Sequence, residues 1–153
     1  MEIEKELNEI LKILNTYGKG YIVGGYVRDK LMGVKPKDYD FCTDIDYEKL
    51  LYIFKKYNPK EMGKAFGIVQ INYKGKAFEI AKLRRDSDFT KERNKLQIEF
   101  VNDIYEDLKR RDFTVNAIAF NGEKLIYESE LSKEDIKNKI IRFVGEGRER
   151  IKE

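Results

Sequence analysis

The sequence contains no histidine, a single cysteine (Cys42) and two prolines in 153 residues. Without histidine, the chain lacks the commonest general base and the commonest protein ligand for transition metals. One cysteine cannot form a disulfide within the chain or a cysteine-rich zinc site. Any chemistry in this chain must therefore depend on carboxylates and cationic side chains.

The sequence also lacks a long apolar run. No stretch approaches the ~20 apolar residues that cross a bilayer, and the first residues alternate charged and aliphatic side chains, unlike a signal peptide. We therefore expect a cytoplasmic protein with no membrane partner. Charged residues make up 39% of the chain and nearly cancel to a formal net charge of +3. An anionic partner would have to be recognised by local clusters of charge.

The length and the hydrophobic content of 41% predict one domain with a real core, spanning residues 1–153. The spacing of apolar residues predicts a mixed α/β fold. Helices are expected from Ile3 to near Gly18 and over 27–32, 46–57, 103–120 and 132–139. Strands are expected over 21–23, 38–43 and 140–144, with a hairpin over 67–83. The polar stretch from Asp86 to about residue 103 predicts a mobile or irregular loop before a strand near 98–101, and residues 147–153 resemble the start of a helix.

The clearest chemical signal is the segment KDYDF, residues 37–41. In a strand, Asp38 and Asp40 point to one face while the aromatic residues point to the other. Two close carboxylates repel unless a cation neutralises them, and a set of oxygen ligands suits Mg²⁺ or Mn²⁺. Glu79, in the alternating run AFEIAKL, offers a third acidic oxygen. The alternative is a polar face on an edge strand, which is the commoner explanation for an isolated pair of acids.

Two further clusters favour phosphate binding. Gly24 and Gly25 follow a short apolar strand, and Arg28 lies one turn into the next helix, so backbone N–H groups and a guanidinium can meet an anion. The alternative is that Arg28 only pairs with Asp29 on the helix surface.

The segment RRDFTVNA, residues 110–117, is the second of these clusters and places two cations, an acid and an amide close together: Arg110, Arg111, Asp112 and Asn116. These groups can meet the sugar and phosphates of a nucleotide. The alternative is a solvated helix face on which arginine pairs with Glu106 or Asp107.

Taken in order, the segments VGGYVRDKLMG, KDYDFCT, FEIAKLR and EDLKRRDFTVNAIAF resemble the head domain of the bacterial and eukaryotic type of tRNA CCA-adding nucleotidyltransferase. The same pattern belongs to the related bacterial poly(A) polymerases, within the DNA polymerase beta-like superfamily. The resemblance covers roughly residues 20 to 150. It implies a small mixed sheet flanked by helices, and transfer of a nucleoside monophosphate from an NTP with Mg²⁺ or Mn²⁺.

The resemblance also implies a role for each cluster. Asp38 and Asp40 would bind the metal ions and act as catalytic residues, with Glu79 in support. The residues that would bind the incoming nucleotide are Gly24, Gly25, Arg28, Arg110, Arg111, Asp112 and Asn116. ATP and/or CTP are the expected nucleotides, and RNA, in particular the 3′ end of tRNA, is the expected acceptor.

The sequence departs from the family pattern in two places. The segment KLIYESELSKEDI, residues 124–136, lacks the Asp-Pro and paired glycines usual there, and we expect the neck, body and tail of the family to be absent. We therefore expect a minimal nucleotidyltransferase, acting alone or completed by a companion subunit that binds RNA. Two alternatives stay open: a transferase with a small-molecule or protein acceptor, and a non-catalytic module that binds nucleotides or RNA.

Overall fold

The computed structural model describes residues 1–90, 95–142, 144 and 150–152. Its helices are α1 (Lys5–Tyr17), α2 (Gly25–Met32), α3 (Tyr47–Ile53), α4 (Ile104–Lys109) and α5 (Glu130–Asn138), with short 3₁₀ turns η1 (Lys55–Tyr57), η2 (Lys64–Phe66) and η3 (Thr114–Asn116). Its strands are β1 (Gly20–Val23), β2 (Asp40–Thr43), β3 (Lys60–Gly63), β4 (Ile68–Tyr73), β5 (Lys76–Lys82), β6 (Arg84–Thr90), β7 (Lys95–Phe100), β8 (Ile118–Phe120), β9 (Leu125–Tyr127), β10 (Ile140–Arg142) and β11 (Arg150–Lys152). Within these ranges, no helix is long and apolar enough to cross a membrane.

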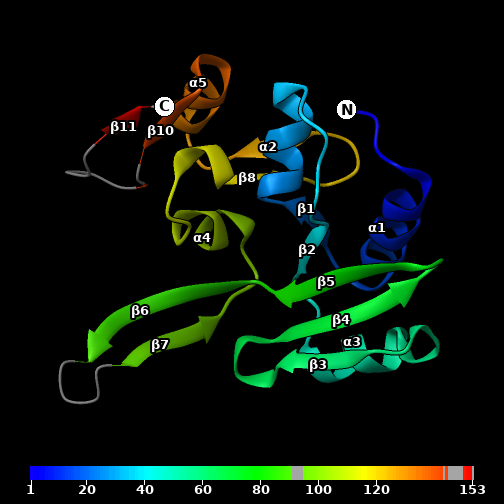
Figure 1. Ribbon diagram of the computed structural model, residues 1–153. Coiled ribbons are helices and arrows are strands. Elements are labelled where there is room, and N and C mark those ends of the chain that lie inside the picture. Colours follow the sequence, from blue (N-terminus) through cyan, green and yellow to red (C-terminus); the bar gives the residue numbers. More distant parts are fainter. Residues whose placement is uncertain (91–94, 143, 145–149, 153) are drawn as a thin grey trace.

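A seven-stranded sheet organises the molecule, in the order β3-β4-β5-β2-β1-β8-β9 (Figure 1). β2 and β5 run parallel, whereas the other neighbouring strands are antiparallel. The prediction of a mixed sheet flanked by helices is confirmed. The parallel pair matters for function because it aligns Asp40 with Glu79 across neighbouring strands.

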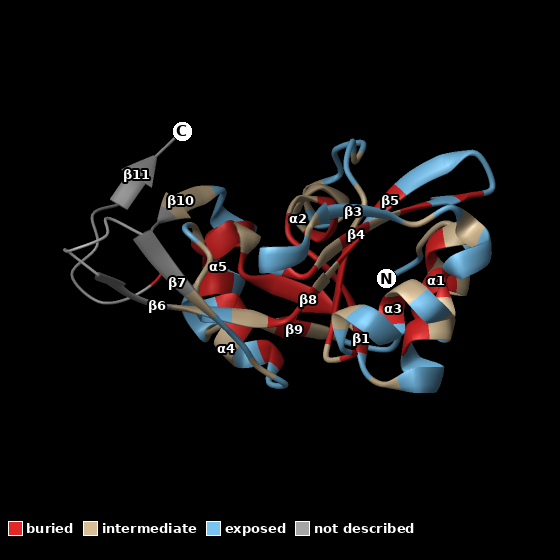
Figure 2. Cartoon of the chain, turned by 90° about the horizontal axis from the view of Figure 1, so that it is seen from below, coloured by how far each residue is buried: buried red, intermediate tan, exposed pale blue. Residues whose placement is uncertain are grey.

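Apolar side chains pack on both faces of this sheet. Alternation along β1 sends Ile22 into a core with α1, α2 and α3, while Tyr21 and Val23 enter a second core with α4. In Figure 2 the buried residues of α1 lie on its inner side and the exposed ones face outward. Cys42 of β2 belongs to the core with α4, so Asp40, two residues earlier, projects from that same face.

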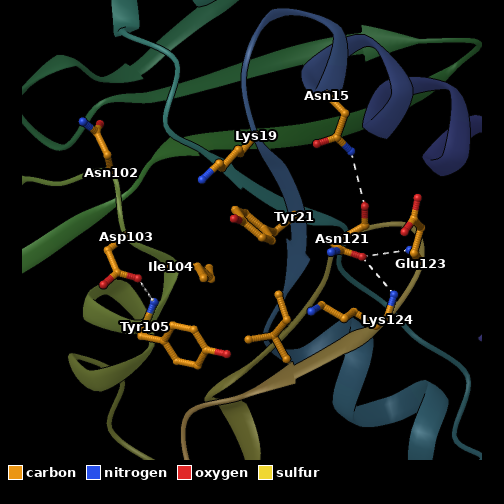
Figure 3. Close-up of a pocket in the computed structure, with 11 residues that line it drawn as sticks. Asn15, Lys19, Tyr21, Asn102, Asp103, Ile104, Tyr105, Asn121, Glu123 and Lys124 are labelled. Atoms are coloured by element: carbon orange, nitrogen blue, oxygen red, sulfur yellow. Dashed lines mark hydrogen bonds between the residues drawn. The ribbon is translucent and has the colours of Figure 1, made fainter.

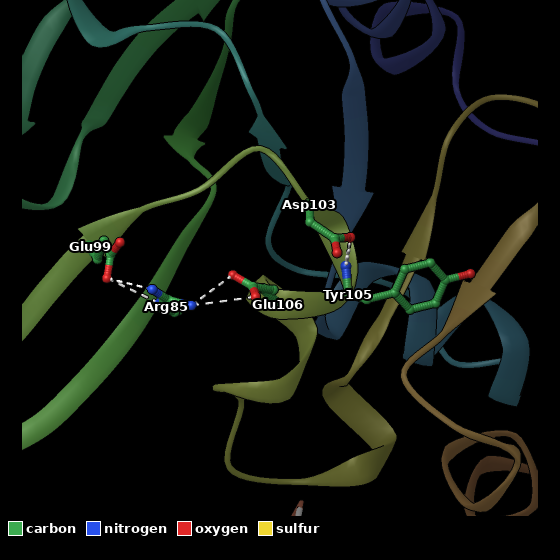
Figure 4. Close-up of polar contacts among 5 residues, drawn as sticks. All are labelled: Arg85, Glu99, Asp103, Tyr105 and Glu106. Carbon is green, nitrogen blue, oxygen red and sulfur yellow. Dashed lines mark hydrogen bonds and ion pairs between the residues drawn. The ribbon is translucent and has the colours of Figure 1, made fainter.

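The polar stretch after Asp86 is not an irregular loop in the part that the structure describes. β6 and β7 form an antiparallel pair in which Arg84 lies opposite Phe100. The guanidinium of Arg85 lies 2.8 Å from Glu99 on β7 and 3.4 Å from Glu106 on α4 (Figure 4). The loop prediction was wrong because the polar residues of β6 give no apolar pattern, while pairing with β7 supplies a strand partner; the strand predicted near 98–101 corresponds to the end of β7.

Two predicted helices are shorter than expected. The helix over 46–57 is α3 followed by η1, because the chain tightens into a 3₁₀ turn after Phe54. The helix over 103–120 ends at Lys109, and residues 118–120 form β8, between β1 and β9 in the sheet, instead. All of β8 is buried, so its sequence lacks the alternation that marks a half-exposed strand.

Strands β3 and β9 were not predicted, since both are short edge strands without a long alternating pattern. Near the C-terminus, the strand predicted over 140–144 corresponds to β10. The helix predicted over 147–153 is wrong for residues 150–152, which form β11 paired with β10. Residues 147–149 and 153 lie outside the described part of the chain.

Candidate active site

Asp38, Asp40 and Glu79 line one cavity of about 390 Å³ at the start of β2. Asp40 is the first residue of β2, whereas Asp38 precedes the strand and is exposed. Tyr39, between them, packs its ring against Tyr26 and Phe78. The opposite directions expected for the acids and the aromatic residue therefore hold, although only Asp40 lies within the strand.

The electrostatics of Asp40 indicate surplus negative charge. The pKa of Asp40 is raised to about 6, first by burial and then by the carboxylates of Glu79 and Asp38, while the Arg111 guanidinium opposes the rise. A hydrogen bond with Glu79 adds to the shift. A carboxylate in this environment is unfavourable when ionised, so the site is suited to a cation.

The residues at this cavity fit a divalent metal ion by the chemistry of their donors. Asp38 and Asp40 offer oxygen ligands of the kind that Mg²⁺ and Mn²⁺ prefer. In the described ranges, no group of three or more acidic or cysteine side chains is arranged to hold a metal ion. A cation bound by Asp38 and Asp40 would thus complete its coordination with water or substrate phosphate, as Mg²⁺ commonly does.

The glycine turn lies between β1 and α2. Gly24 has φ = +70°, a conformation that favours glycine, and its N–H donates to the carbonyl of Ile118 at 3.2 Å. A Cβ at Gly24 would lie 3.6 Å from Nη1 of Arg111, and one at Gly25 would lie 3.4 Å from Nη2 of Arg28. Both guanidinium groups therefore approach the bare backbone at the start of α2.

Arg28 joins two segments that are far apart in the sequence. Its Nη1 donates to Oδ1 of Asn116 at 2.8 Å, and its Nε donates to Oδ1 of Asp29 at 3.0 Å. The pairing with Asp29 on the helix surface, expected as the alternative, is present together with the contact to Asn116. Asn116 ends η3, so a 3₁₀ turn rather than a helix positions it.

Arg110 and Arg111 lie just beyond the end of α4 and are mostly buried. Asp107 accepts hydrogen bonds from Nε of Arg110 at 3.4 Å and from Nη2 of Arg111 at 3.0 Å. These arginines are not on a solvated helix face, because Asp107 is fully buried. Asp112 differs from its neighbours: its side chain is exposed, and its carbonyl accepts from the N–H of Val144 at 2.9 Å.

Asp107 is a residue that the sequence analysis did not assign to the site. The sequence predicts Asp107 only as a surface partner for arginine. Its position four residues before Arg111 in a helix is the signal that could have assigned it to the site. Local spacing does not distinguish Asp107 from Glu106, because burial depends on which side of α4 packs against the sheet.

A larger cavity, of about 630 Å³, lies at the opposite end of β1 from Gly24. Asn15, Lys19, Tyr21, Tyr105 and Lys124 are among the side chains that line it (Figure 3). None of the residues predicted for catalysis or nucleotide binding lines this cavity. Cavity size therefore does not identify the candidate active site, which is defined by its chemistry.

A mixed sheet with acids at the start of one strand, beside a glycine turn and converging arginines, has the architecture of a nucleotidyltransferase head domain. The family model for the Poly A polymerase head domain matches residues 20–142. The chain belongs to this family, as the sequence motifs predict.

Curated relatives and solved structures agree with this membership. The chain is 37% identical to a CCA-adding enzyme of Oceanobacillus iheyensis over 92% of its length, and 37% identical to one of Staphylococcus aureus over 97%. It resembles the structure of Bacillus stearothermophilus CCA-adding enzyme in complex with CTP, with a TM-score of 0.77 and 34% identity over 94% of the chain. It also resembles a tRNA nucleotidyltransferase complexed with a primer tRNA and an incoming ATP analog, with a TM-score of 0.65 and 29% identity over 91% of the chain.

The match covers only part of each relative. The chain spans 34% of the Oceanobacillus protein and 37% of the Staphylococcus protein. It spans 35% of the Bacillus chain and 39% of the chain complexed with primer tRNA. The shared part is the head domain.

Proposed function

We propose that this chain is the catalytic head of a nucleotidyltransferase that moves a nucleoside monophosphate from an NTP to the 3′ hydroxyl of an RNA, with tRNA as the first candidate. The observation that carries the proposal is the meeting of two charge clusters at one end of the sheet. Arg111, which lies beside the glycine turn, also opposes the rise in the pKa of Asp40 through its positive charge. A metal–triphosphate needs both an acidic metal site and adjacent cations.

Each cluster has a distinct role in this proposal. Asp38 and Asp40 would hold two divalent ions, Mg²⁺ or Mn²⁺, and Glu79 would support Asp40 from β5. Such ions would supply the means to lower the pKa of an attacking hydroxyl and to neutralise charge on a leaving pyrophosphate. This chemistry requires no histidine.

The nucleotide-binding groups do not line the cavity of the acids; they gather around the glycine turn, next to Arg28 and Arg111. Backbone N–H groups at the start of α2, with Arg28 and Arg111, bind the triphosphate, and Arg110 adds positive charge behind them. We assign Asn116, which Arg28 holds, and the exposed Asp112 to the ribose.

The nucleotide and acceptor follow from the relatives. CTP, an ATP analog and a primer tRNA occur in the related structures, so we propose ATP and/or CTP as nucleotides and a tRNA 3′ end as acceptor. The relatives are longer, so selection of the base and binding of the RNA would depend on other protein segments. If residues 1–153 act as a single head domain, a companion subunit would supply those segments. We propose the cytoplasm as its compartment, since these substrates occur there.

The proposal is tested by incubating the protein with each labelled NTP, Mg²⁺ or Mn²⁺, and tRNAs that end before, within and after CCA. The control is the Asp38→Ala/Asp40→Ala variant. Incorporation into RNA that falls at least about 100-fold in the control is expected, because both proposed metal ligands are lost. Equal incorporation by the control would refute the assigned site. Absence of both NTP binding and incorporation in the wild-type protein would refute the function.

A further inference from the structure

The carboxylate of Asp107 is fully buried and connects three parts of the chain. Its Oδ1 accepts from Nη2 of Arg111 at 3.0 Å. Its Oδ2 accepts from the backbone N–H of Arg84 at 2.9 Å and from Nε of Arg110 at 3.4 Å. A buried carboxylate is costly unless paired and hydrogen-bonded, so this arrangement constrains each of its donors.

The contact fixes the direction of Arg111. While Nη2 is bound to Asp107, Nη1 faces Gly24, 3.6 Å from the position of a Cβ on that residue. A free arginine side chain would lose rotamer entropy when it bound a phosphate. Here most of that ordering exists before a ligand arrives.

The contact also permits two guanidinium groups to lie close together. Burial lowers the pKa of Arg110, and the charge of Arg111 lowers it further, whereas Asp107 opposes the shift. Without the carboxylate, the two cations would repel each other, and Arg111 would turn toward solvent. Arg85, by comparison, pairs with Glu106, a more exposed acid of the same helix (Figure 4).

We infer that Asp107 is a positioning residue of the triphosphate site: it holds the guanidinium of Arg111 beside the glycine turn in the geometry that receives a phosphate. The inference rests on the proposed function, because it takes Arg111 as a ligand of the triphosphate. It adds a residue that touches neither the nucleotide nor the metal ions but acts through Arg111. The same carboxylate anchors the first residue of β6, so the β6–β7 hairpin and the triphosphate site share one support.

The test is a double-mutant cycle on ligand affinity, which requires no turnover. Calorimetry would measure binding of magnesium tripolyphosphate and of Mg–ATP to the wild type, Asp107→Asn, Arg111→Ala and the double variant. Asn keeps an oxygen for the Arg84 N–H but loses the charge, so about 10-fold weaker binding is expected from a lost charged hydrogen bond. In the Arg111→Ala background, the same substitution should change affinity less than about twofold. Glu106→Gln, the neighbouring acid on α4, is the matched control and should bind like the wild type.

The outcomes separate the inference from the function. If Asp107→Asn weakens binding equally with and without Arg111, Asp107 supports only the fold, and the inference is overturned while triphosphate binding stands. If the wild type binds neither probe, the proposed function and the inference fail together. If the Asp107 variants do not fold, Arg111→Lys tests the inference instead. A lysine cannot bridge Asp107 and a phosphate as a guanidinium does. We therefore again expect about 10-fold weaker binding. Full affinity in that variant would overturn the inference.

Discussion

At the scale of single residues, the candidate active site collects like charges that a folded protein usually separates. Asp40 is partly buried near Glu79 and Asp38, and Arg110 is partly buried beside Arg111. Asp107 compensates the arginines from within the chain. The acids have only partial compensation from Arg111, so the metal-free protein carries an electrostatic cost at Asp40.

This cost predicts a pH-dependent effect of Asp40→Asn on stability. The pKa of Asp40 rises from 3.8 to about 6 on folding, so the native protein loses stability as pH increases through that window. In EDTA at pH 8, Asn should therefore stabilise the fold by roughly 1 kcal/mol, after allowance for solvent screening. Urea unfolding at pH 8 and at pH 4 would measure it. The advantage should shrink at pH 4, and an equal difference at both values would contradict the prediction; the exposed Glu123→Gln is the control.

At the scale of elements, the β6–β7 hairpin depends on surface ion pairs. Backbone groups at both ends of this pair join the main body: the N–H of Arg84 donates to Asp107, and Val101, just after β7, donates its N–H to Leu83 at 2.9 Å. Exposed ion pairs contribute little to global stability, about 1 kcal/mol or less each. They can nonetheless set the local opening of a two-stranded element.

Arg85→Ala should therefore loosen the hairpin without unfolding the protein. The substitution removes the contacts to Glu99 and Glu106, so backbone amides of β6 and β7 should exchange about threefold to fivefold faster. Hydrogen exchange read by mass spectrometry would show this, with amides of β1 and β8 unchanged. Lys64→Ala, which breaks the exposed contact to Glu48, provides the control. Unchanged exchange in β6 and β7 would show that other contacts hold the hairpin.

At the scale of the whole molecule, the two hydrophobic cores pack on opposite faces of the same sheet. Leu50 of α3 is fully buried in one core, and Leu108 of α4 is fully buried in the other. β1 and β2 send side chains to both, so neither core can come apart without disturbing the strands that carry the site.

Leu50→Ala and Leu108→Ala should each lower the free energy of unfolding of the whole protein, by about 2 to 5 kcal/mol. Each variant should unfold in one transition, with the same midpoint by far-ultraviolet circular dichroism and by tyrosine absorbance. Tyr52→Phe, at a side chain that is 69% exposed, should leave the midpoint unchanged. Two separate transitions in either leucine variant would show that the cores are independent.

Sequence alone determined the local features of this protein. Apolar spacing defined α1, the alternating runs defined β4 and β5, and the motifs around Gly24, Asp40 and Arg111 were sufficient for the family. These features depend on neighbours a few residues away, or on exact residue types in a fixed order, and both can be recognised without coordinates.

Only the tertiary structure decided which residues of distant segments lie next to one another. The parallel pairing of β2 with β5 placed Glu79 next to Asp40, and packing of α4 on the sheet buried Asp107 rather than Glu106. The position of β8 inside the sheet was hidden because a fully buried strand has no alternation. Periodicity reports which face of an element is covered, whereas strand order and helix docking depend on contacts between distant parts of the chain.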